Sequence, residues 1–327
     1  MTFSAPRPLV IGTRGSELAL WQARHVQSLL GGEAAGVTLQ IIKTSGDQLL
    51  DIPLQNQLDK GFFTKELEVA LLDGRVDLAV HSLKDLPTQM PQGLVLAAIP
   101  PRAATADLLL MRPAAHAPQR PLPIVPGARI GTASMRRTAL LHHADSTAVA
   151  TFLRGNVPTR LGKAISGELD AVLLARAGVE RLGLPLDQVI AYELSPLRWL
   201  AAAGQGALGL QARAGDQVVL DRLQTLHHAE TAAAVDLERG LLRKLEGGCH
   251  TAFGARAVVT GPLATLTAGL TDSADRWHAV AVRGAVADLI DAGFEALQTV
   301  LRGDPHPADV TAAGAEEPWG RQVHAWS

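Results

Sequence analysis

The sequence predicts an α/β fold in two parts, followed by a smaller α+β part. Strand and helix signals alternate through the first hundred residues, which indicates βαβ units and a largely parallel sheet. A Pro- and Ala-rich stretch, Arg112 to Gly127, interrupts this alternation, which then starts again. From His228 the pattern changes to a long helix, three strand-like runs and a closing helix. We therefore expect two α/β domains and a third domain of different architecture.

In the first part, apolar patterning predicts the helices and strands, and capping residues and glycines predict where the helices begin and end. Ser16 is an N-cap candidate for a helix that Gly31 and Gly32 end, and Thr64 can cap a second helix that ends at Asp73 and Gly74. The predicted strands are Pro8–Gly12, Val37–Ile42, Val76–His81 and Leu94–Ile99. The run Ala207–Ala212 alternates like a further strand.

The second and third parts are predicted in the same way. In the second part we expect strands at Arg129–Gly131, Ala148–Leu153, Ala171–Leu174 and Val189–Tyr192, and helices at Ser134–His142, Thr159–Ser166 and Ala175–Leu182. In the third part we expect a helix ending at Leu245, strands at Phe253–Thr260, Ala264–Leu270 and Trp277–Arg283, and a helix at Val286–Arg302.

Composition narrows the class of protein. With 327 residues, 47% of them hydrophobic, the chain can bury several cores, and extensive disorder is excluded. A formal net charge of −2 argues against non-specific nucleic-acid binding, so any anion site has to be built locally. The single cysteine allows no intramolecular disulfide. No apolar run is long enough for a signal sequence or a bilayer span, so we expect a cytoplasmic protein with no membrane partner.

Three loops between a strand and a helix combine arginines with hydroxyl groups. They are Ile11–Ser16, Ile130–Arg137 and Leu153–Arg160. Ligands of α/β sheets bind beyond the carboxyl ends of strands, and helix N-termini favour anions. Each loop alone is also compatible with a capped turn or a solvated surface arginine. Their recurrence favours a ligand with several carboxylates or phosphates, which arginine binds bidentately.

Two further segments are open to interpretation. Asp85 lies in Ser82–Pro87 at a predicted strand end, where a carboxylate can serve as a general acid or base. On this segment alone, an ion pair within the loop, such as one with Lys84, is the favoured explanation. Gly204–Gly209 matches the dinucleotide pattern GxGxxG in its letters. The motif should open a helix, whereas a strand is predicted here, so we reject a nicotinamide or flavin site.

Cys249 lies between two glycines and a histidine after the long helix, a setting that favours an exposed, reactive thiol over a buried one. The sequence has no CxxC spacing, and its adjacent histidines, at 142–143 and 227–228, would diverge on a helix. We therefore expect no metal site.

Together these segments resemble the porphobilinogen deaminase (hydroxymethylbilane synthase) family. The resemblance rests on seven runs in the family's order: TRGSELALWQA from Thr13, KGFFTKELE from Lys60, DLAVHSLKDLP from Asp77, GTASMRR from Gly131, LRGNVPTR from Leu153, AGQGALG from Ala203 and LEGGC from Leu245. It implies two α/β domains similar to periplasmic binding proteins and a smaller α+β C-terminal domain. The implied boundaries are 1–100 with 205–226, 105–200 and 228–303, followed by a tail at 304–327.

The resemblance also implies the activity: a transferase that polymerises four porphobilinogen molecules, with loss of ammonia, into hydroxymethylbilane for tetrapyrrole and heme biosynthesis. Cys249 would hold a dipyrromethane cofactor by a thioether, and Asp85 would be the catalytic acid. The implied cofactor-binding positions are Lys84, Thr132, Ser134, Arg136, Arg137 and Arg154. The implied substrate-binding positions are Arg14, Ser16, Lys60, Phe63, Arg154, Arg160, Arg181 and Gln205. The family also implies a monomer.

The sequence departs from many relatives at Asn56, where lysine is common, at Pro158, where glycine is common, and at His250–Thr251 after the cysteine. Two rival functions stay open at this point. A non-catalytic two-domain polyanion-binding protein would need neither Cys249 nor Asp85. An unrelated cysteine enzyme using Cys249 with His250 would leave the arginine loops unexplained.

Overall fold

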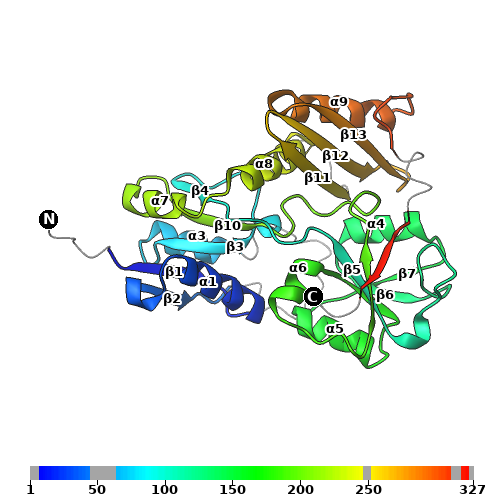
Figure 1. Cartoon of the computed structure of the whole chain (residues 1–327), viewed down its shortest axis with the longest axis horizontal. Helices are drawn as coiled ribbons and strands as arrows, with labels where there is room; N and C mark the ends of the chain where they lie inside the picture. The colour runs from blue at the N-terminus through cyan, green and yellow to red at the C-terminus, as the bar shows by residue number, and fades with distance from the viewer. Residues whose placement is uncertain (1–6, 45–63, 246–251, 311–317, 324–327) are drawn as a thin grey trace. The chain divides into compact units, whose positions relative to one another are not determined.

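The structure, a computed structural model, describes residues 7–44, 64–245, 252–310 and 318–323. The chain forms two compact units, one from Met1–Ala103 with Gly206–Ala232 and one from Ala104–Gln205 with Ala233–Ser327. Helices and strands are mixed in both, and a smaller sheet with a helix follows near the C-terminus (Figure 1). This confirms the predicted fold class. None of the helices among these residues is long and apolar enough to cross a bilayer.

The first unit is built around a five-stranded sheet. Its strands are β1 (Leu9–Thr13), β2 (Val37–Ile41), β3 (Leu78–Ser82), β4 (Leu94–Ala98) and β10 (Leu208–Arg213), in the order β2-β1-β3-β10-β4. Its helices are α1 (Glu17–Leu29), α3 (Lys65–Leu72) and α7 (Gln217–Gln224), with short 3-10 turns η1 (Glu33–Ala35) and η2 (Leu83–Asp85). The predicted cap of α1 is confirmed, because the Ser16 side chain accepts a hydrogen bond from the Ala19 N–H.

The sheet of the first unit is mixed rather than largely parallel. β1 runs parallel to β2 and β3, whereas β10 runs antiparallel to both β3 and β4. The chain reaches β10 only after leaving the first unit and returning to it, so β10 does not close a right-handed βαβ crossover. Buried residues such as Leu9, Ile11 and Leu210 form the core.

The second unit contains a six-stranded sheet. Its strands are β5 (Asp107–Met111), β6 (Arg129–Thr132), β7 (Val149–Phe152), β8 (Ala171–Ala175), β9 (Ile190–Leu194) and β14 (Gly320–Val323), in the order β14-β9-β5-β8-β6-β7. Its helices are α4 (Met135–Ala144), α5 (Val157–Ile165) and α6 (Arg176–Arg181), with a 3-10 turn η3 (Pro113–Ala115). Ser134 and Asn156 cap α4 and α5 through their side-chain oxygens.

Strand β5 was not expected from the sequence. All five of its residues are buried, and it runs antiparallel to β8 and β9 in the middle of the sheet. A continuous apolar run without alternation is typical of a strand covered on both faces, which explains why periodicity missed it. Nearby, β6 needs Gly131, because a Cβ there would lie 2.6 Å from the side chains of both Leu153 and Leu169.

The C-terminal α+β part also belongs to the second unit. After α8 (Ala229–Leu245), the antiparallel strands β11 (Phe253–Thr260), β12 (Leu263–Thr271) and β13 (Trp277–Ala285) form a sheet in that order. A 3-10 turn, η4 (Val286–Asp288), leads into α9 (Leu289–Leu301), which covers one face of this sheet (Figure 1). Buried leucines and alanines from α8, α9 and the three strands form its core.

The C-terminal strand β14, red in Figure 1, completes the edge of the six-stranded sheet by pairing antiparallel with β9. Trp319 precedes it and is only 4% exposed. The guanidinium of Arg198 lies 3.8 Å from the centre of the Trp319 indole, and His143 meets that ring edge-on at 5.8 Å. The Ser195 N–H donates to the Trp319 carbonyl at 2.8 Å, so both the backbone and the indole ring of Trp319 have partners.

We predict that Trp319→Ala lowers the free energy of unfolding by about 3 kcal/mol, the scale for truncating a buried aromatic side chain. Arg321→Ala is the matched control on β14, since the Arg321 side chain is 75% exposed in its ion pair with Glu193. The control should change stability by less than about 1 kcal/mol. Urea denaturation measures both, and equal small effects would show that β14 adds no stability.

Candidate functional site

The loop after β1 brings Arg14 and Ser16 to the N-terminus of α1. Both side chains are half-buried, and Ser16 is the N-cap residue of the helix. Thr13, just before them, is fully buried, and its hydroxyl group hydrogen-bonds the Ala19 carbonyl at 3.1 Å. The buried Thr13 therefore fixes the loop against α1, and Arg14 and Ser16 lie at the helix N-terminus, where backbone N–H groups favour an anion.

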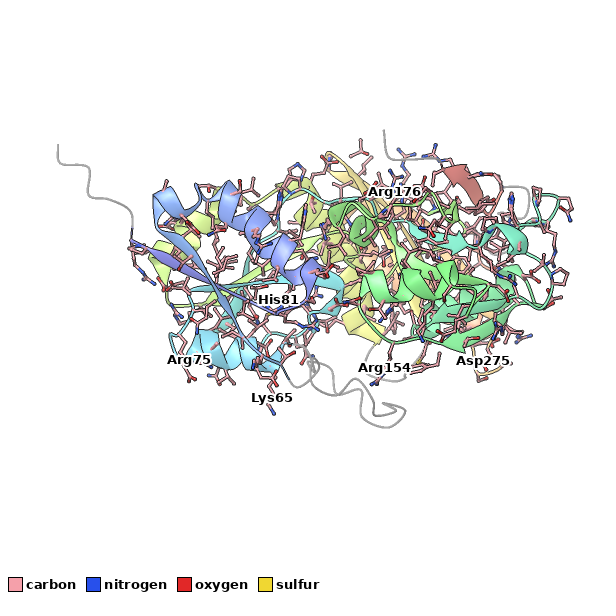
Figure 2. The ribbon with its side chains drawn as sticks, turned by 90° about the horizontal axis from the view of Figure 1, so that it is seen from below. Lys65, Arg75, His81, Arg154, Arg176 and Asp275 are labelled. Atoms are coloured by element: carbon pink, nitrogen blue, oxygen red, sulfur yellow. The ribbon has the colours of Figure 1, made fainter. Side chains whose placement is uncertain are left out.

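His81 on β3 is buried beside this loop, and Figure 2 shows it among the strands. Its Nε2 lies 3.1 Å from Oε1 of Gln211, whose Nε2 donates to a Glu68 carboxylate oxygen. Because the Gln211 oxygen can only accept, Nε2 of His81 carries the proton. Burial lowers the pKa of His81 to about 4, the bond to Gln211 opposes this, and the positive charge of Arg14 lowers it further. His81 is thus neutral near pH 7.

Lys84 and Asp85 follow β3 in the 3-10 turn η2. The turn is fastened to β10, because the Leu83 N–H donates to the Ala207 carbonyl at 3.0 Å. Lys84 is half-buried, and Asp85 is exposed. No hydrogen bond or ion pair joins Asp85 to any other residue in the described part of the chain, so the ion pair with Lys84 considered above is not formed. The carboxylate is presented to solvent on a rigid turn.

In the second unit, the loop between β6 and α4 presents Thr132 and Ser134. Thr132 is buried, and its hydroxyl oxygen accepts the Ser134 N–H at 3.1 Å. The Ser134 side chain in turn accepts the Arg137 N–H at 3.4 Å. These bonds order the first turn of α4 and fix where the next two side chains leave the helix.

Arg136 and Arg137 are buried, with exposed fractions of 5% and 6%. Both bind the carboxylate of Asp107, the first residue of β5, at 2.9 Å from Arg136 and 2.7 Å from Arg137. Each also donates to a backbone carbonyl, Arg136 to Leu200 at 2.7 Å and Arg137 to Leu173 at 2.9 Å. These arginines are anchored in the protein interior rather than being solvated surface residues.

Two more side chains converge on Asp107. The Trp199 indole N–H donates to one carboxylate oxygen at 3.0 Å, and the Gln205 amide donates to the other at 2.9 Å. Gln205 and Asp107 are both fully buried. We name Asp107, Arg136, Arg137, Trp199 and Gln205 the Asp107 cluster.

The Asp107 cluster retains capacity to bind an anion. One carboxylate faces two guanidinium groups, so the pair of arginines carries one positive charge in excess. Nε of Arg136 and Nε of Arg137 are buried and have no hydrogen-bond partner in the described residues. Burial lowers the pKa of Arg136, an effect that the charge of Asp107 opposes and that of Arg137 reinforces. A ligand carboxylate would satisfy these donors and this charge.

The three other arginines of the second unit that were predicted as site residues, Arg154, Arg160 and Arg181, are half-buried. The Arg154 guanidinium, labelled in Figure 2, lies 5.6 Å from the centre of the exposed Phe152 ring. Arg160 donates from Nε to the Gly155 carbonyl at 2.7 Å, and Gly155 has φ +112°, a conformation that favours glycine. Burial lowers the pKa of Arg181 to about 10, which the nearby charge of Glu180 partly offsets.

Pro158 lies in the first turn of α5, where its missing N–H costs no helical hydrogen bond. It therefore stiffens the turn that carries Arg160 without disturbing the helix. Other positions named above, Lys60, Phe63, Asn56 and Cys249, lie outside the described residues.

Sequence reasoning missed Asp107, Trp199 and His81. The signal for Asp107 was an acid at the head of the apolar run Leu108–Met111, since a charged residue there needs buried partners. His81 carried a similar signal, as one of two polar residues, with Asp77, within the predicted strand Val76–His81. Nothing local marked Trp199, whose role depends on a residue 92 positions earlier.

The family model and the curated relatives that match this chain carry the same name. Residues 9–221 match the family model described as porphobilinogen deaminase, dipyromethane cofactor binding domain. The chain is 49% identical over 258 residues to a porphobilinogen deaminase of Nitratidesulfovibrio vulgaris, covering 77% of this chain and 79% of that one. It is 41% identical over 317 residues to that of Maridesulfovibrio salexigens, covering 95% and 97%.

Solved structures that match the chain have lower sequence identity and low TM-scores. An ancestral arginine-binding protein bound to arginine is 13% identical, with a TM-score of 0.36, covering 68% of this chain and 92% of that chain. A Salmonella typhimurium periplasmic binding protein with high arginine specificity is 11% identical, with a TM-score of 0.37, covering 70% and 97%.

The neutral His81 predicts a pH dependence of stability. Because its folded-state pKa of about 4 lies below the ordinary value of 6.5, the unfolded chain binds more protons between these values. Stability therefore falls as the pH drops through this window, by about 2 kcal/mol from pH 7 to pH 5 for this group.

The test compares urea unfolding of the wild type and His81→Gln at pH 7 and pH 5. The variant should lose less stability than the wild type on acidification, whatever its stability at pH 7. His116→Gln, at a half-buried histidine, is the control. Identical pH dependence in wild type and His81→Gln would contradict a buried neutral imidazole.

Proposed function

Because the chain belongs to the porphobilinogen deaminase family, we propose that the loops described above carry the residues that perform the family's reaction. The protein is a transferase of tetrapyrrole biosynthesis that joins porphobilinogen molecules into hydroxymethylbilane, with loss of ammonia. It uses the dipyrromethane cofactor of the family. The rival interpretation as a non-catalytic polyanion-binding protein is not supported.

The residues of the second unit fit a dipyrromethane, whose pyrroles carry acetate and propionate groups. The observation that supports this is the pair of buried, unsatisfied Nε donors on Arg136 and Arg137, together with their excess positive charge. Thr132, Ser134 and Arg154 add donors on neighbouring loops, and Lys84 is assigned to the same cofactor by resemblance. When bound through Cys249, the cofactor supplies the primer pyrrole to which substrate is joined.

Asp85 is proposed as the catalytic acid, and its setting is the single observation that carries this role. Asp85 is exposed and has no hydrogen-bond or ion-pair partner among the described residues, and it lies on a turn that is bonded to β10, so it has no evident structural task there. Such a group can pass a proton to the departing amine and offset positive charge on a pyrrole nitrogen. Lys84 beside it favours the ionised form of bound carboxylates.

The substrate-binding set is proposed from the resemblance and supported by chemistry. Each incoming porphobilinogen brings two carboxylates, so a growing chain needs many cationic donors in fixed positions. The half-buried state of the described arginines suits this task, because desolvation strengthens their attraction for anions. The proposed set is Arg14, Ser16, Lys60, Phe63, Arg154, Arg160, Arg181 and Gln205.

We also propose that the enzyme acts as a monomer in the cytoplasm. The support is the family resemblance, together with a single cysteine that requires no oxidising compartment. Light scattering coupled to size-exclusion chromatography tests the monomer.

We predict that Asp85→Asn lowers turnover at least about a hundredfold without loss of folding, since the amide keeps the shape but cannot exchange the proton or carry charge. Asp85→Glu should retain more activity, because the carboxylate survives but is displaced. Asp187→Asn, at another exposed aspartate, is the control and should leave turnover unchanged. Ammonia release from porphobilinogen measures all three. Near wild-type turnover of Asp85→Asn would remove Asp85 from the mechanism.

We predict that Cys249→Ser abolishes covalent attachment of the cofactor, because a serine hydroxyl is a far weaker nucleophile than a thiolate. Intact mass of wild type and variant, both expressed in a host that makes porphobilinogen, measures attachment without any assay of activity. The wild type should carry the added mass of two pyrrole units and the variant should not. Equal masses would contradict the role of Cys249.

A further inference from the structure

The Asp107 carboxylate accepts four hydrogen bonds in a fully buried position. One oxygen binds Arg137 and Gln205, and the other binds Arg136 and Trp199, all at 2.7 to 3.0 Å. The four donors come from α4 and from the segment after β9, while Asp107 itself begins the central strand β5. A buried carboxylate with this many donors holds each of them in one orientation.

This arrangement leaves the two guanidinium groups constrained but not neutralised. Asp107 and the carbonyls of Leu200 and Leu173 occupy the terminal nitrogens, whereas both Nε atoms stay unsatisfied in the described residues. A purely structural ion-pair cluster gains stability by matching charges and satisfying donors. Here two cations share one anion, which favours an additional anion at the arginines.

We infer that Asp107 is a positioning residue for the reaction, which orients Arg136 and Arg137 toward the carboxylates of the cofactor. The inference rests on the cofactor-binding role proposed above for the two arginines. Without Asp107, the two like-charged, flexible arginine side chains would move apart. The conformational entropy lost in ordering them would then weaken cofactor binding. With Asp107, that cost is met during folding.

Gln205 and Trp199 also hold the Asp107 carboxylate in place. The Gln205 Nε2 donates to the Thr105 carbonyl at 2.7 Å as well as to Asp107, so both of its N–H groups are used inside the protein. Gln205 is also fully buried. Its amide N–H groups therefore help to hold Asp107, in addition to the role near the substrate that the resemblance assigns to Gln205.

Asp107→Asn separates the carboxylate's function from its size. In either orientation, the new amide NH₂ faces one arginine and one neutral donor, so one guanidinium loses its acceptor. The matched control is Asp170→Asn in the same unit. Asp170 is also buried, at 8% exposed, and it binds Arg112 at 2.9 Å and the Arg129 N–H at 2.8 Å. Both of these partners lie outside the Asp107 cluster.

The experiment measures three quantities for both variants: the melting temperature, the fraction of purified protein carrying the cofactor mass, and kcat and KM for porphobilinogen per folded molecule. We expect Asp170→Asn to lower the melting temperature while its cofactor fraction and kcat/KM stay within threefold of wild type. We expect Asp107→Asn to reduce the cofactor fraction or kcat/KM at least tenfold at a temperature where it is folded.

If Asp107→Asn keeps kcat/KM and cofactor fraction within threefold of Asp170→Asn, Asp107 is only structural and the inference is wrong. Should Asp107→Asn fail to fold, Trp199→Phe serves instead, because it removes one donor to Asp107 and keeps most of the ring. A threefold to tenfold drop in kcat/KM supports the inference, and no drop overturns it. A wild-type protein that turns over porphobilinogen but carries no added cofactor mass would contradict the role of Cys249, whereas the kcat/KM of Asp107→Asn relative to Asp170→Asn would still test Asp107.

Discussion

One buried carboxylate joins three segments of the second unit that are distant in sequence. Asp107 begins β5, and its four hydrogen bonds join that strand to the start of α4 and to the segment that follows β9. A carboxylate enters the protein interior only when its charge and lone pairs are matched, and here they are matched by two arginines, a tryptophan and a glutamine. The position of β5 in the middle of its sheet and the direction of the two arginines are therefore set by the same interaction.

The first turn of α4 places two cations where folding alone does not favour them. Cations at a helix N-terminus oppose the helix dipole, and Arg136 and Arg137 lie there side by side. Asp107 offsets this conflict only in part, because it brings one charge against two. Leucines at 136 and 137 with an apolar residue at 107 would fill the same space without buried charge, and such replacements are often neutral or stabilising. The excess positive charge is consistent with a ligand that carries carboxylates.

Features that depend on neighbouring residues, such as helix caps and apolar runs, could be predicted from the sequence. Features that depend on pairing between distant residues could not. Ser16 and Ser134 were recognisable as helix caps because a cap depends on the next three residues. The strands Phe253–Thr260 and Leu208–Arg213 followed from apolar runs or alternation. Strand β5 was missed because a fully buried run has no period, and its neighbours β8 and β9 come more than 60 residues later. The burial of Arg136 was invisible for the same reason, since its partner lies 29 residues away.

His81 and Asp85, four residues apart, show how the fold assigns different tasks to two titratable groups. His81 points into the first sheet, where burial keeps it uncharged and Gln211 fixes which nitrogen holds the proton. A charged imidazole there would add to the charge of Arg14 and compete with it for any anion. Asp85 is the last residue of the 3-10 turn that follows β3, and its side chain is exposed to water. The strand end thus separates a buried, neutral imidazole from an exposed carboxylate.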